Sequence, residues 1–481
     1  MAVKDLREWI AKMDEFGDIE RVDGANVEEE IGVITDIYQR KPGSPALLFD
    51  NVPGYPQGYR VLSNSVVSLN RIAFSIGLPY GAPGMEIVDR WRHVMHDSKP
   101  VPAAEKETGT VLKNVLVGDD INCLAFPTPK WHELDGGRYV GTACLVLTRD
   151  PDNLEWVNAG TYRVMVHDEK HLGLMISNGK HGRIMLEKYW SRGQACPVAI
   201  VVGQDPLLYM VSGMEIPNGV TEYEFAGGVQ GRPVEVVKGP KTGLPIPADA
   251  ELAFEGELRP DDMRDEGPFG EWTGYYAGGV RPEPVITVTS ILHRNDPIML
   301  GSCPAVPPSD TSYFRSPLRS AIVWNEIEAA GVAGIKGVWA HEAGSGRLLL
   351  IVSIKQLYGG HSRQAGLIAS QCHGGAYTNR MVIVVDDDID IFDTNQVLWA
   401  MLTRADPVED YEILRKCWST RLDPISYPIG QNLFNNRVVI DACRSYDRFI
   451  AGTFPEVATS TPDAVKRITE KWGQLFPVVQ K

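Results

Sequence analysis

The middle third of this 481-residue chain carries the pattern that most strongly limits its fold. Short apolar segments follow one another there, separated by turns: "TACLVLTRD", "EWVNAGTYRVMVHD", "HLGLMIS", "VAIVVG", "PVEVVKG" and "AELAFEGEL". Such a series is typical of an antiparallel sheet or barrel. From about residue 318 onward, helices and strands alternate instead, which predicts an α/β domain. The chain therefore combines two architectures.

The N-terminal part is predicted to be mainly helical. Apolar residues repeat at helical spacing through "LREWIAKMDEF", with Asp5 placed to cap this helix and Gly17 placed to end it. Further helices are expected over about residues 27–40, 68–77 and 85–97, with a strand at "PALLFDNV". At this length the chain suggests two or three domains.

Charge and composition exclude several classes of partner. The net charge of −15 argues against nucleic acid and anionic membranes, because either would require a basic face. The charged N-terminus lacks the apolar core of a signal peptide, and no apolar run is long enough to span a membrane. The seven cysteines form no CxxC pair, as expected for free thiols in a reducing compartment. These features predict a cytoplasmic enzyme.

Several motifs carry chemistry, and each has a structural alternative. "DEGPFGEWTGYY" places Glu266 and Glu271 on either side of a glycine-bounded turn, where solvated acids are also common. "HDEKH" (167–171) has two histidines four residues apart, but a solvated turn is the more usual interpretation. "VVDDDID" (384–390) follows an apolar strand and fits either a magnesium site or a solvated sheet edge. "GGHSRQAG" (359–366) could place an anion at a helix N-terminus.

The segment "WVNAGTYRVMVHD" has two polar residues that need partners. Asn158 is unusual within a strand, and Arg163 requires an anion. Strict alternation would place these two residues on opposite faces, so only a bend, with Gly160 as its candidate, would bring them together. Two more loops carry polar groups between glycines, namely "NGKHGR" with His181 and "VSGMEIPNGVTEYEFAGG" with Glu222.

Taken jointly, these segments resemble the UbiD-like family of decarboxylases, which use prenylated FMN. The most specific matches are "NAGTYR", "KHG", "SGMEIPNGVTEYEFAGG" and "EGPFGEWTGYY", and their order and separations agree with the family. The resemblance begins at "DLREWIAKMDEFGDIERV" and extends to "VVDDDIDIFDTNQVLWAMLTRADP", over most of the chain. Within the family, the chain looks most similar to the bacterial phenolic or hydroxyarylic acid decarboxylases.

The resemblance implies a metal and a flavin. A divalent metal, usually manganese, would be bound by Asn158, His181 and Glu222 beside the cofactor phosphate, and an amide, an imidazole and a carboxylate suit Mn²⁺. Potassium would lie near Ser212 and Met214. The implied cofactor-binding residues are Asn158, Gly160, Thr161, Tyr162, Arg163, Lys180, His181, Gly182, Ser212, Met214, Glu222 and Lys355.

The resemblance also implies a catalytic network of Glu266, Arg163 and Glu271. Loss of CO₂ from an sp² carbon leaves electron density that a cofactor must accept, and the vacated carbon then needs a proton. Glu271 is expected to donate it, because burial and like-charge repulsion raise the pKa of one acid of such a pair. Trp272, Tyr275 and Tyr276 are expected to keep that acid dry.

The implied fold is a multidomain α+β and α/β structure. An N-terminal α/β segment (1–118) and a C-terminal α/β domain (313–481), with a dimerising C-terminal helix, would flank a split β-barrel that binds prenylated FMN (119–312). Partners would be a small aromatic carboxylic acid, CO₂, a flavin prenyltransferase and a second copy of the chain. A homodimer or a higher homo-oligomer is expected.

The substrate and two rival functions remain open at this stage. A small hydroxylated or heterocyclic aromatic acid is favoured over a polyprenylated one, and residues 301–314 and 424–436 are expected to contribute to selectivity. A split-barrel FMN oxidoreductase would explain the barrel but not the paired acids. A metal-dependent hydrolase would explain the acids and the metal, but it needs no flavin.

Overall fold

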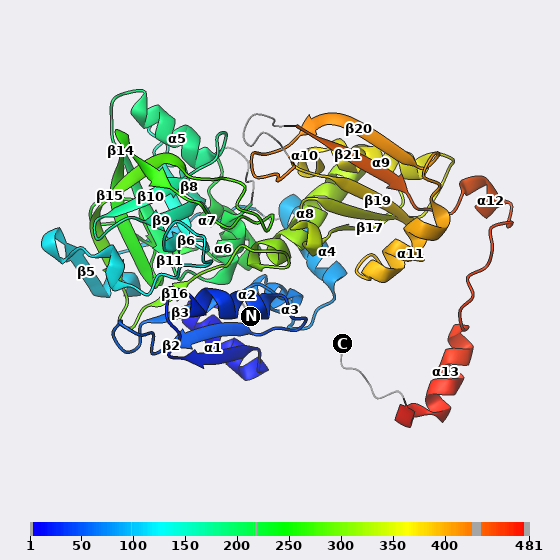
Figure 1. Ribbon diagram of the computed structural model, residues 1–481, viewed down its shortest axis with the longest axis horizontal. Helices are drawn as coiled ribbons and strands as arrows, with labels where there is room; N and C mark the ends of the chain where they lie inside the picture. Colours follow the sequence, from blue (N-terminus) through cyan, green and yellow to red (C-terminus); the bar gives the residue numbers. More distant parts are fainter. Residues whose placement is uncertain (1–2, 98, 215, 217–218, 426–433, 476–481) are drawn as a thin grey trace.

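The computed structural model describes residues 3–97, 99–214, 216, 219–425 and 434–475. Figure 1 shows a β-rich central body, a smaller N-terminal layer beneath it, a C-terminal α/β body beside it, and a last helix that extends away. This is the mixed α/β multidomain architecture that the sequence predicts. Within the described ranges, no helix combines the length and apolar character that crossing a membrane requires.

The central body is built on one large, mainly antiparallel sheet. Its path runs through β6 (Tyr139–Gly141), β9 (Arg163–Val166), β10 (His171–Met175), β15 (Arg281–His293), β14 (Leu252–Glu266), β11 (Cys196–Val202), β7 (Leu145–Arg149) and β8 (Val157–Gly160). A further strand, β5 (Asn114–Val117), pairs with β15. The sheet curls, because β6 also contacts β11 from the other half of the path.

Three helices cover one end of this sheet. They are α5 (His181–Trp190), α6 (Pro206–Ser212) and α7 (Glu222–Gln230), and they pack against β7 and β8. A small sheet lies beside them and contains β13 (Pro245–Pro247), β12 (Glu235–Lys238) and β4 (Ala104–Lys106). The loops that carried the sequence motifs therefore converge at β8.

The N-terminal layer has a four-stranded sheet whose last strand comes from far along the chain. The order is β1 (Ile19–Asp23), β2 (Ala46–Asp50), β3 (Arg60–Ser63) and β16 (Ile298–Leu300). Its helices are α1 (Leu6–Phe16), α2 (Glu30–Gln39), α3 (Leu69–Ser75) and α4 (Gly84–Asp97). The predicted caps of α1 are confirmed, since Asp5 accepts the Glu8 N–H at 2.9 Å and Gly17 has φ 67°.

The C-terminal body alternates strands and helices, as the sequence predicts. Its sheet has the order β17 (Ile335–Ala340), β18 (Leu349–Ile354), β19 (Met381–Asp386), β21 (Phe434–Asp441) and β20 (Tyr411–Trp418). Its helices are α8 (Asp310–Ala329), α9 (His361–Gln371), α10 (His373–Ala376), α11 (Thr394–Arg404), α12 (Tyr446–Ile450) and α13 (Pro462–Lys471). Only the last of these projects away from the body (Figure 1).

Two local predictions were wrong, and both corrections matter for the site. The segment "WVNAGTYRVMVHD" is two strands rather than one: β8 pairs with β7, whereas β9 pairs with β6 and β10. Thr161 breaks the run, because its N–H donates to the Ser212 carbonyl at 3.0 Å. Glu266, expected in an irregular stretch, is instead the last residue of β14.

Candidate active site

Two buried carboxylates are bridged by one arginine. Nη1 of Arg163 donates to Oε1 of Glu271 at 2.6 Å, and Nη2 donates to Oε2 of Glu266 at 2.5 Å. The side chain of Glu266 is fully buried, and those of Glu271 and Arg163 are each only 8% exposed. The structure thus joins the three residues predicted to form a catalytic network.

The local chain geometry explains how these groups meet. Arg163 opens β9 and Glu266 ends β14, so both lie at strand termini near one edge of the curled sheet. The turn that follows is anchored, because the Gly270 N–H donates to Oδ1 of Asp135 at 2.9 Å. Gly136 passes so close that a Cβ there would lie 2.0 Å from the Gly267 carbonyl oxygen. The glycines therefore allow a packed loop to carry Glu271 back to Arg163.

The electrostatics give Glu271 the character of an acid. Burial raises the pKa of Glu271; Arg163 opposes this rise and the nearby Glu266 adds to it. For Arg163, burial disfavours the charge, but the two carboxylates outweigh it and the pKa rises. Arg163 is therefore a permanent cation, whereas Glu271 can keep a proton to higher pH than an exposed glutamate.

The aromatic shield differs from the expected one. The ring of Phe269, from the same turn, lies 5.0 Å from the Arg163 guanidinium carbon and packs 4.4 Å from the Tyr139 ring, both measured to ring centroids. Tyr275 is 61% exposed, so its expected role in keeping the acid dry was wrong. Tyr275 contacts Glu271 through the backbone, where the Glu271 N–H donates to the Tyr275 carbonyl at 3.1 Å.

The predicted metal ligands gather around β8. Asn158 lies within this strand, and Glu222, the first residue of α7, accepts the Ala159 N–H at 2.7 Å. His181 is the first residue of α5. The centroid of its ring lies 5.2 Å from that of Trp156, the residue just before β8. Burial raises the pKa of Glu222 to about 7, and the N–H groups of Ala159 and Glu222 lower it only in part.

The predicted flavin-binding residues lie next to these ligands. The Tyr162 hydroxyl donates to Oδ1 of Asn158 at 3.2 Å and accepts the Gly182 N–H at 3.4 Å. Cβ atoms at Gly160 and Gly182 would collide with the Tyr162 ring, at 2.5 and 2.8 Å. These two glycines therefore leave room for the Tyr162 ring between β8 and α5.

Thr161 connects this group to α6. Its hydroxyl donates to the Cys144 carbonyl at 2.8 Å and is hydrogen-bonded to the Ser212 hydroxyl. Met214 follows one turn later, where its N–H donates to the Val211 carbonyl at 3.0 Å. The predicted potassium-binding positions are thus next to the β8–β9 link that carries Arg163.

Lys355 stands apart from the other predicted residues. It lies exposed just after β18 in the C-terminal sheet, with its N–H donating to the Gly334 carbonyl at 2.8 Å. Lys180 caps the start of α5 beside His181. Of the two segments expected to influence selectivity, 301–314 is described, whereas residues 426–433 of the other lie outside the described ranges.

The alternative metal motifs are occupied by ion pairs. Asp168 of "HDEKH" contacts Nδ1 of His171 at 2.7 Å and Arg264 at 2.8 Å. Burial opposes its charge, but hydrogen bonds from the Lys170 N–H, Arg264 and His171 lower its pKa to about 2. In the second motif, Asp386 contacts Arg404 at 3.0 Å. In the part of the chain that the structure describes, no three His, Cys, Asp or Glu side chains form a metal-binding group.

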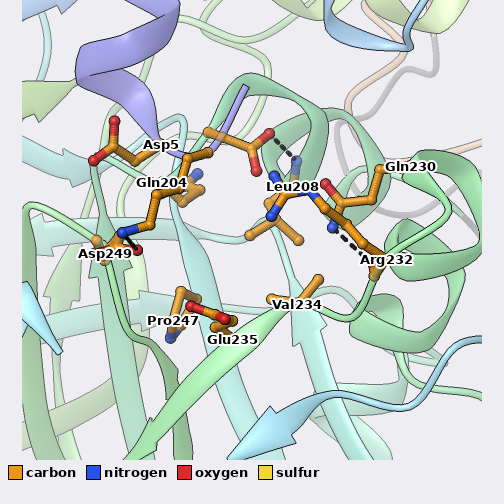
Figure 2. A pocket seen from close by; sticks show the side chains of 12 residues that line it. Asp5, Gln204, Leu208, Gln230, Arg232, Val234, Glu235, Pro247 and Asp249 are labelled. Atoms are coloured by element: carbon orange, nitrogen blue, oxygen red, sulfur yellow. Dashed lines mark hydrogen bonds and ion pairs between the residues drawn. The ribbon is translucent and has the colours of Figure 1, made fainter. Parts of the chain in front are cut away.

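A small surface hollow of about 40 Å³ lies elsewhere, between the N-terminus and α6 (Figure 2). It is lined by acidic and basic side chains, and Lys4 and Asp249 across it form an ion pair of 3.0 Å. The half-buried Asp205 caps α6 there by accepting the Leu207 N–H at 2.7 Å. None of the predicted site residues lines this hollow.

Sequence reasoning missed two charged neighbours of the network. Arg281 and Glu283, at the start of β15, form an ion pair of 2.5 Å. Their segment "RPEP" gave no periodic or motif signal, because their position follows from the pairing of β15 with β14. Tyr139 was also missed, although an isolated tyrosine beside "DGGR" carries no signal in sequence alone.

Family models match almost the whole chain. The 3-octaprenyl-4-hydroxybenzoate carboxy-lyase N-terminal, Rift-related and C-terminal domains match residues 10–91, 103–307 and 312–442. A phenolic acid decarboxylase of Escherichia coli O157:H7 is 30% identical, with 98% of each chain covered. A pyrrole-2-carboxylic acid decarboxylase of Pseudomonas aeruginosa is 31% identical, with 85% of this chain and 84% of that one covered.

Solved structures agree over the same length. The open form of the vanillic acid decarboxylase of Sedimentibacter hydroxybenzoicus matches with a TM-score of 0.85, 27% identity and 99% of each chain covered. The UbiD-class enzyme HmfF from Pelotomaculum thermopropionicum, solved with FMN, matches with a TM-score of 0.85 and 27% identity over 96% of this chain and 98% of that one. An evolved dimeric form of that enzyme was solved with prenylated FMN.

Fold and relatives together define a decarboxylase, an enzyme of the carboxy-lyase class. The chain belongs to the UbiD family.

Proposed function

We propose that this enzyme catalyses the reversible, non-oxidative decarboxylation of a small aromatic acid with prenylated FMN. The observation that carries the proposal is the buried arrangement in which Arg163 bridges Glu266 and Glu271. Relatives that decarboxylate phenolic and pyrrole acids, and a UbiD-class structure with prenylated FMN, support the substrate class and the cofactor. An FMN oxidoreductase would give the paired acids no role, and a metal-dependent hydrolase would need no flavin.

Glu271 supplies the proton in this proposal. Breaking the bond to the carboxylate releases CO₂ and leaves an electron pair on the ring carbon. Prenylated FMN, when bound, provides the sink for that pair. The protonated carboxyl of Glu271 then donates its proton to the carbon, and water returns a proton to Glu271 for the next turnover. Arg163 stays charged throughout and stabilises the carboxylate that this donation leaves.

The residues around β8 fit a manganese ion. Glu222 is buried, its Oε2 accepts the Ala159 N–H at 2.7 Å, and burial raises its pKa to about 7, so that a bound cation would stabilise its ionised form. The amide oxygen of Asn158, in β8, and the imidazole of His181, at the start of α5, would be the other two ligands. Together they form a mostly hard donor set without a thiolate. These three residues would bind Mn²⁺, which would offset cofactor phosphate charge.

Cofactor binding extends along the same cluster. Gly160, Thr161, Tyr162, Lys180 and Gly182 would contact the flavin and its phosphate. Ser212 and Met214 would lie near K⁺, with Lys355 reaching the phosphate from the C-terminal sheet. On this proposal the curled sheet is a split β-barrel flavin domain at 119–312, between the segments 1–118 and 313–481.

A hydroxylated or heterocyclic aromatic acid is the proposed substrate, by analogy with the relatives. Residues 301–314 begin directly after β16 and run into the start of α8. The side chain of His132, whose Nε2 lies 2.8 Å from the Pro304 carbonyl, links this segment to the Glu271 turn, because a Cβ at Gly270 would lie 2.6 Å from the same ring. The segment is therefore placed to influence selectivity.

A cytoplasmic homodimer, supplied with cofactor by a flavin prenyltransferase, completes the proposal. The helix α13 and the residues just after it carry an apolar stripe that is exposed in the described part of the chain, formed by Val465, Ile468, Trp472 and Leu475, which are 42–64% exposed. Such a stripe on a projecting helix suits contact with a second copy. A dimeric form of HmfF supports this oligomeric state.

The experiment is to produce the protein with Mn²⁺, with and without a flavin prenyltransferase. We expect a bound mass equal to prenylated FMN, an altered flavin spectrum, and CO₂ release from a hydroxylated or heterocyclic aromatic acid in the first sample only. Unmodified FMN in both samples, with no acid decarboxylated, would contradict the cofactor and the substrate class. Protein without any flavin in either sample would overturn the proposal.

A further inference from the structure

The Glu266–Arg163–Glu271 network does not end at these three residues. In β14 and β15, Glu266 pairs with Arg281 and Arg264 pairs with Glu283. Since cross-strand partners share a face and so do residues two apart, Arg281 and Glu283 project from the face that carries Glu266. Nε of Arg281 donates to Oε1 of Glu283 at 2.5 Å, and the two side chains are 26% and 12% exposed.

This pair acts electrostatically on the buried acids. Burial raises the pKa of Glu283; Arg281 opposes the rise, Glu266 adds to it and Arg163 counteracts it. Arg281 also lowers the pKa of Glu271. One extended group thus contains three carboxyls and two guanidinium ions, with Arg281 as its most exposed member.

The other titratable groups near this set do not change its balance. Arg264 is neutralised by Asp168 at 2.8 Å, and burial lowers the pKa of His167, which keeps that imidazole neutral. Burial raises the pKa of Tyr139 far above neutrality. Burial also raises the pKa of Asp135, whose Oδ1 accepts the Gly270 N–H.

We propose that Arg281 and Glu283 are positioning residues that complete the charge balance of the network, so that one proton stays on the buried acids until catalysis uses it. Three carboxylates facing two guanidinium ions leave one excess negative charge in a poorly solvated place, and a retained proton removes it. The proposal rests on the proposed function only in naming Glu271 as the acid that uses this proton.

The two members of the pair should have opposite effects. Glu283→Gln removes a negative charge, so all remaining carboxyls can ionise and the alkaline limb of the kcat–pH profile moves down by about one pH unit. Arg281→Gln removes a positive charge and moves the same limb up by about one pH unit. In the double variant the alkaline limb should lie close to its wild-type position. Arg281→Lys keeps the positive charge and should leave the limb where it is in the wild type.

A matched control exists on the neighbouring strand. Glu257 and Arg259 of β14 form the same kind of pair, two residues apart and 2.5 Å long, but their side chains are 33% and 65% exposed. Glu257→Gln and Arg259→Gln should leave the profile unchanged. A purely structural role for Arg281 and Glu283 would lower kcat at all pH values without moving the limb.

A second readout is independent of decarboxylation. Infrared titration of the carboxyl band in cofactor-free protein, with Glu271→Gln used to assign the Glu271 signal, reports its protonation directly. Opposite displacements of that titration in Glu283→Gln and Arg281→Gln support the proposal, even if no aromatic acid proves to be a substrate. Unchanged titration in both variants, or displacement in the same direction, overturns it whatever the activity of the holoenzyme.

Discussion

Arg163 is the residue on which the candidate site depends. It is the partner that both buried glutamates share, with N–O distances of 2.6 and 2.5 Å. Removing one member of a buried ion pair is costly because the remaining charges stay without compensation. The arginine is therefore expected to matter for folding stability as well as for chemistry.

Arg163→Gln should destabilise the protein by about 3 kcal/mol near pH 8. Arg163 lowers the pKa of the buried Glu271, so without the cation its folded-state pKa rises further above that of the unfolded chain. Acids with raised pKa values favour the folded state below their unfolded pKa, and this contribution is lost as the pH rises through the folded pKa. The loss of folding stability relative to wild type should therefore be smaller at pH 5 than at pH 8. Thermal melts at both pH values would measure this loss.

The exposed Arg259→Gln variant is the control for this prediction. Its stability should differ little from wild type at either pH, because surface ion pairs contribute little. An Arg163→Gln deficit that is equal at pH 5 and pH 8 would contradict an electrostatic role for Arg163.

At the scale of elements, α7 places Glu222 through its N-terminal cap. The Thr221 hydroxyl accepts the Glu224 N–H at 3.1 Å, and the Glu224 carboxylate accepts the Thr221 N–H at 3.1 Å. This capping box fixes the first turn of the helix, which begins with Glu222. The metal proposal thus depends on a local hydrogen-bond pattern.

Thr221→Ala should cost about 1 kcal/mol of stability. It should also reduce the manganese retained after dialysis, since the first turn would no longer fix Glu222 toward Asn158. Metal analysis of the purified variant tests this expectation. Thr461→Ala, which removes the cap of the exposed helix α13, should leave manganese content unchanged. Full retention of manganese in Thr221→Ala would argue against the proposed ligand set.

The sequence alone predicted most helices and strands, but it did not predict the break between β8 and β9 that places Arg163 in the site. Helical spacing and caps were sufficient for α1, where Asp5 accepts the Glu8 N–H at 2.9 Å as expected. The separation of β8 from β9 arises from contacts of Thr161 with Ser212, which lies 51 residues away in sequence. Arg281 and Glu283 likewise depend on strand register. Long-range pairing of this kind leaves no local pattern to read.

At the scale of the whole molecule, the site brings together distant parts of the central sheet. β10 and β15 lie between β9 and β14 in the sheet, and Arg163 and Glu266 meet across 103 positions of sequence. The resemblance to the family had already predicted that these residues form one group.

The projecting helix α13 predicts the oligomeric state. A chain ending at Gly452 lacks the apolar stripe and should be monomeric, whereas the full chain should be at least dimeric by light scattering after gel filtration. Full-length Glu470→Gln, altered on the opposite face of the helix, should behave like wild type. An unchanged mass for the shortened chain would show that α13 does not hold the copies together.

The most direct test of the account is the fate of the proton at Glu271. Wild-type and Glu271→Gln enzymes, each carrying the same flavin, would be given a hydroxylated or heterocyclic aromatic acid in D₂O while CO₂ and ring deuterium are measured. We predict CO₂ release with one deuterium on the vacated carbon for wild type, and a decarboxylation rate at least about 100-fold lower for the variant. Equal product formation and deuteration by both proteins would contradict the assignment of Glu271 as the proton donor.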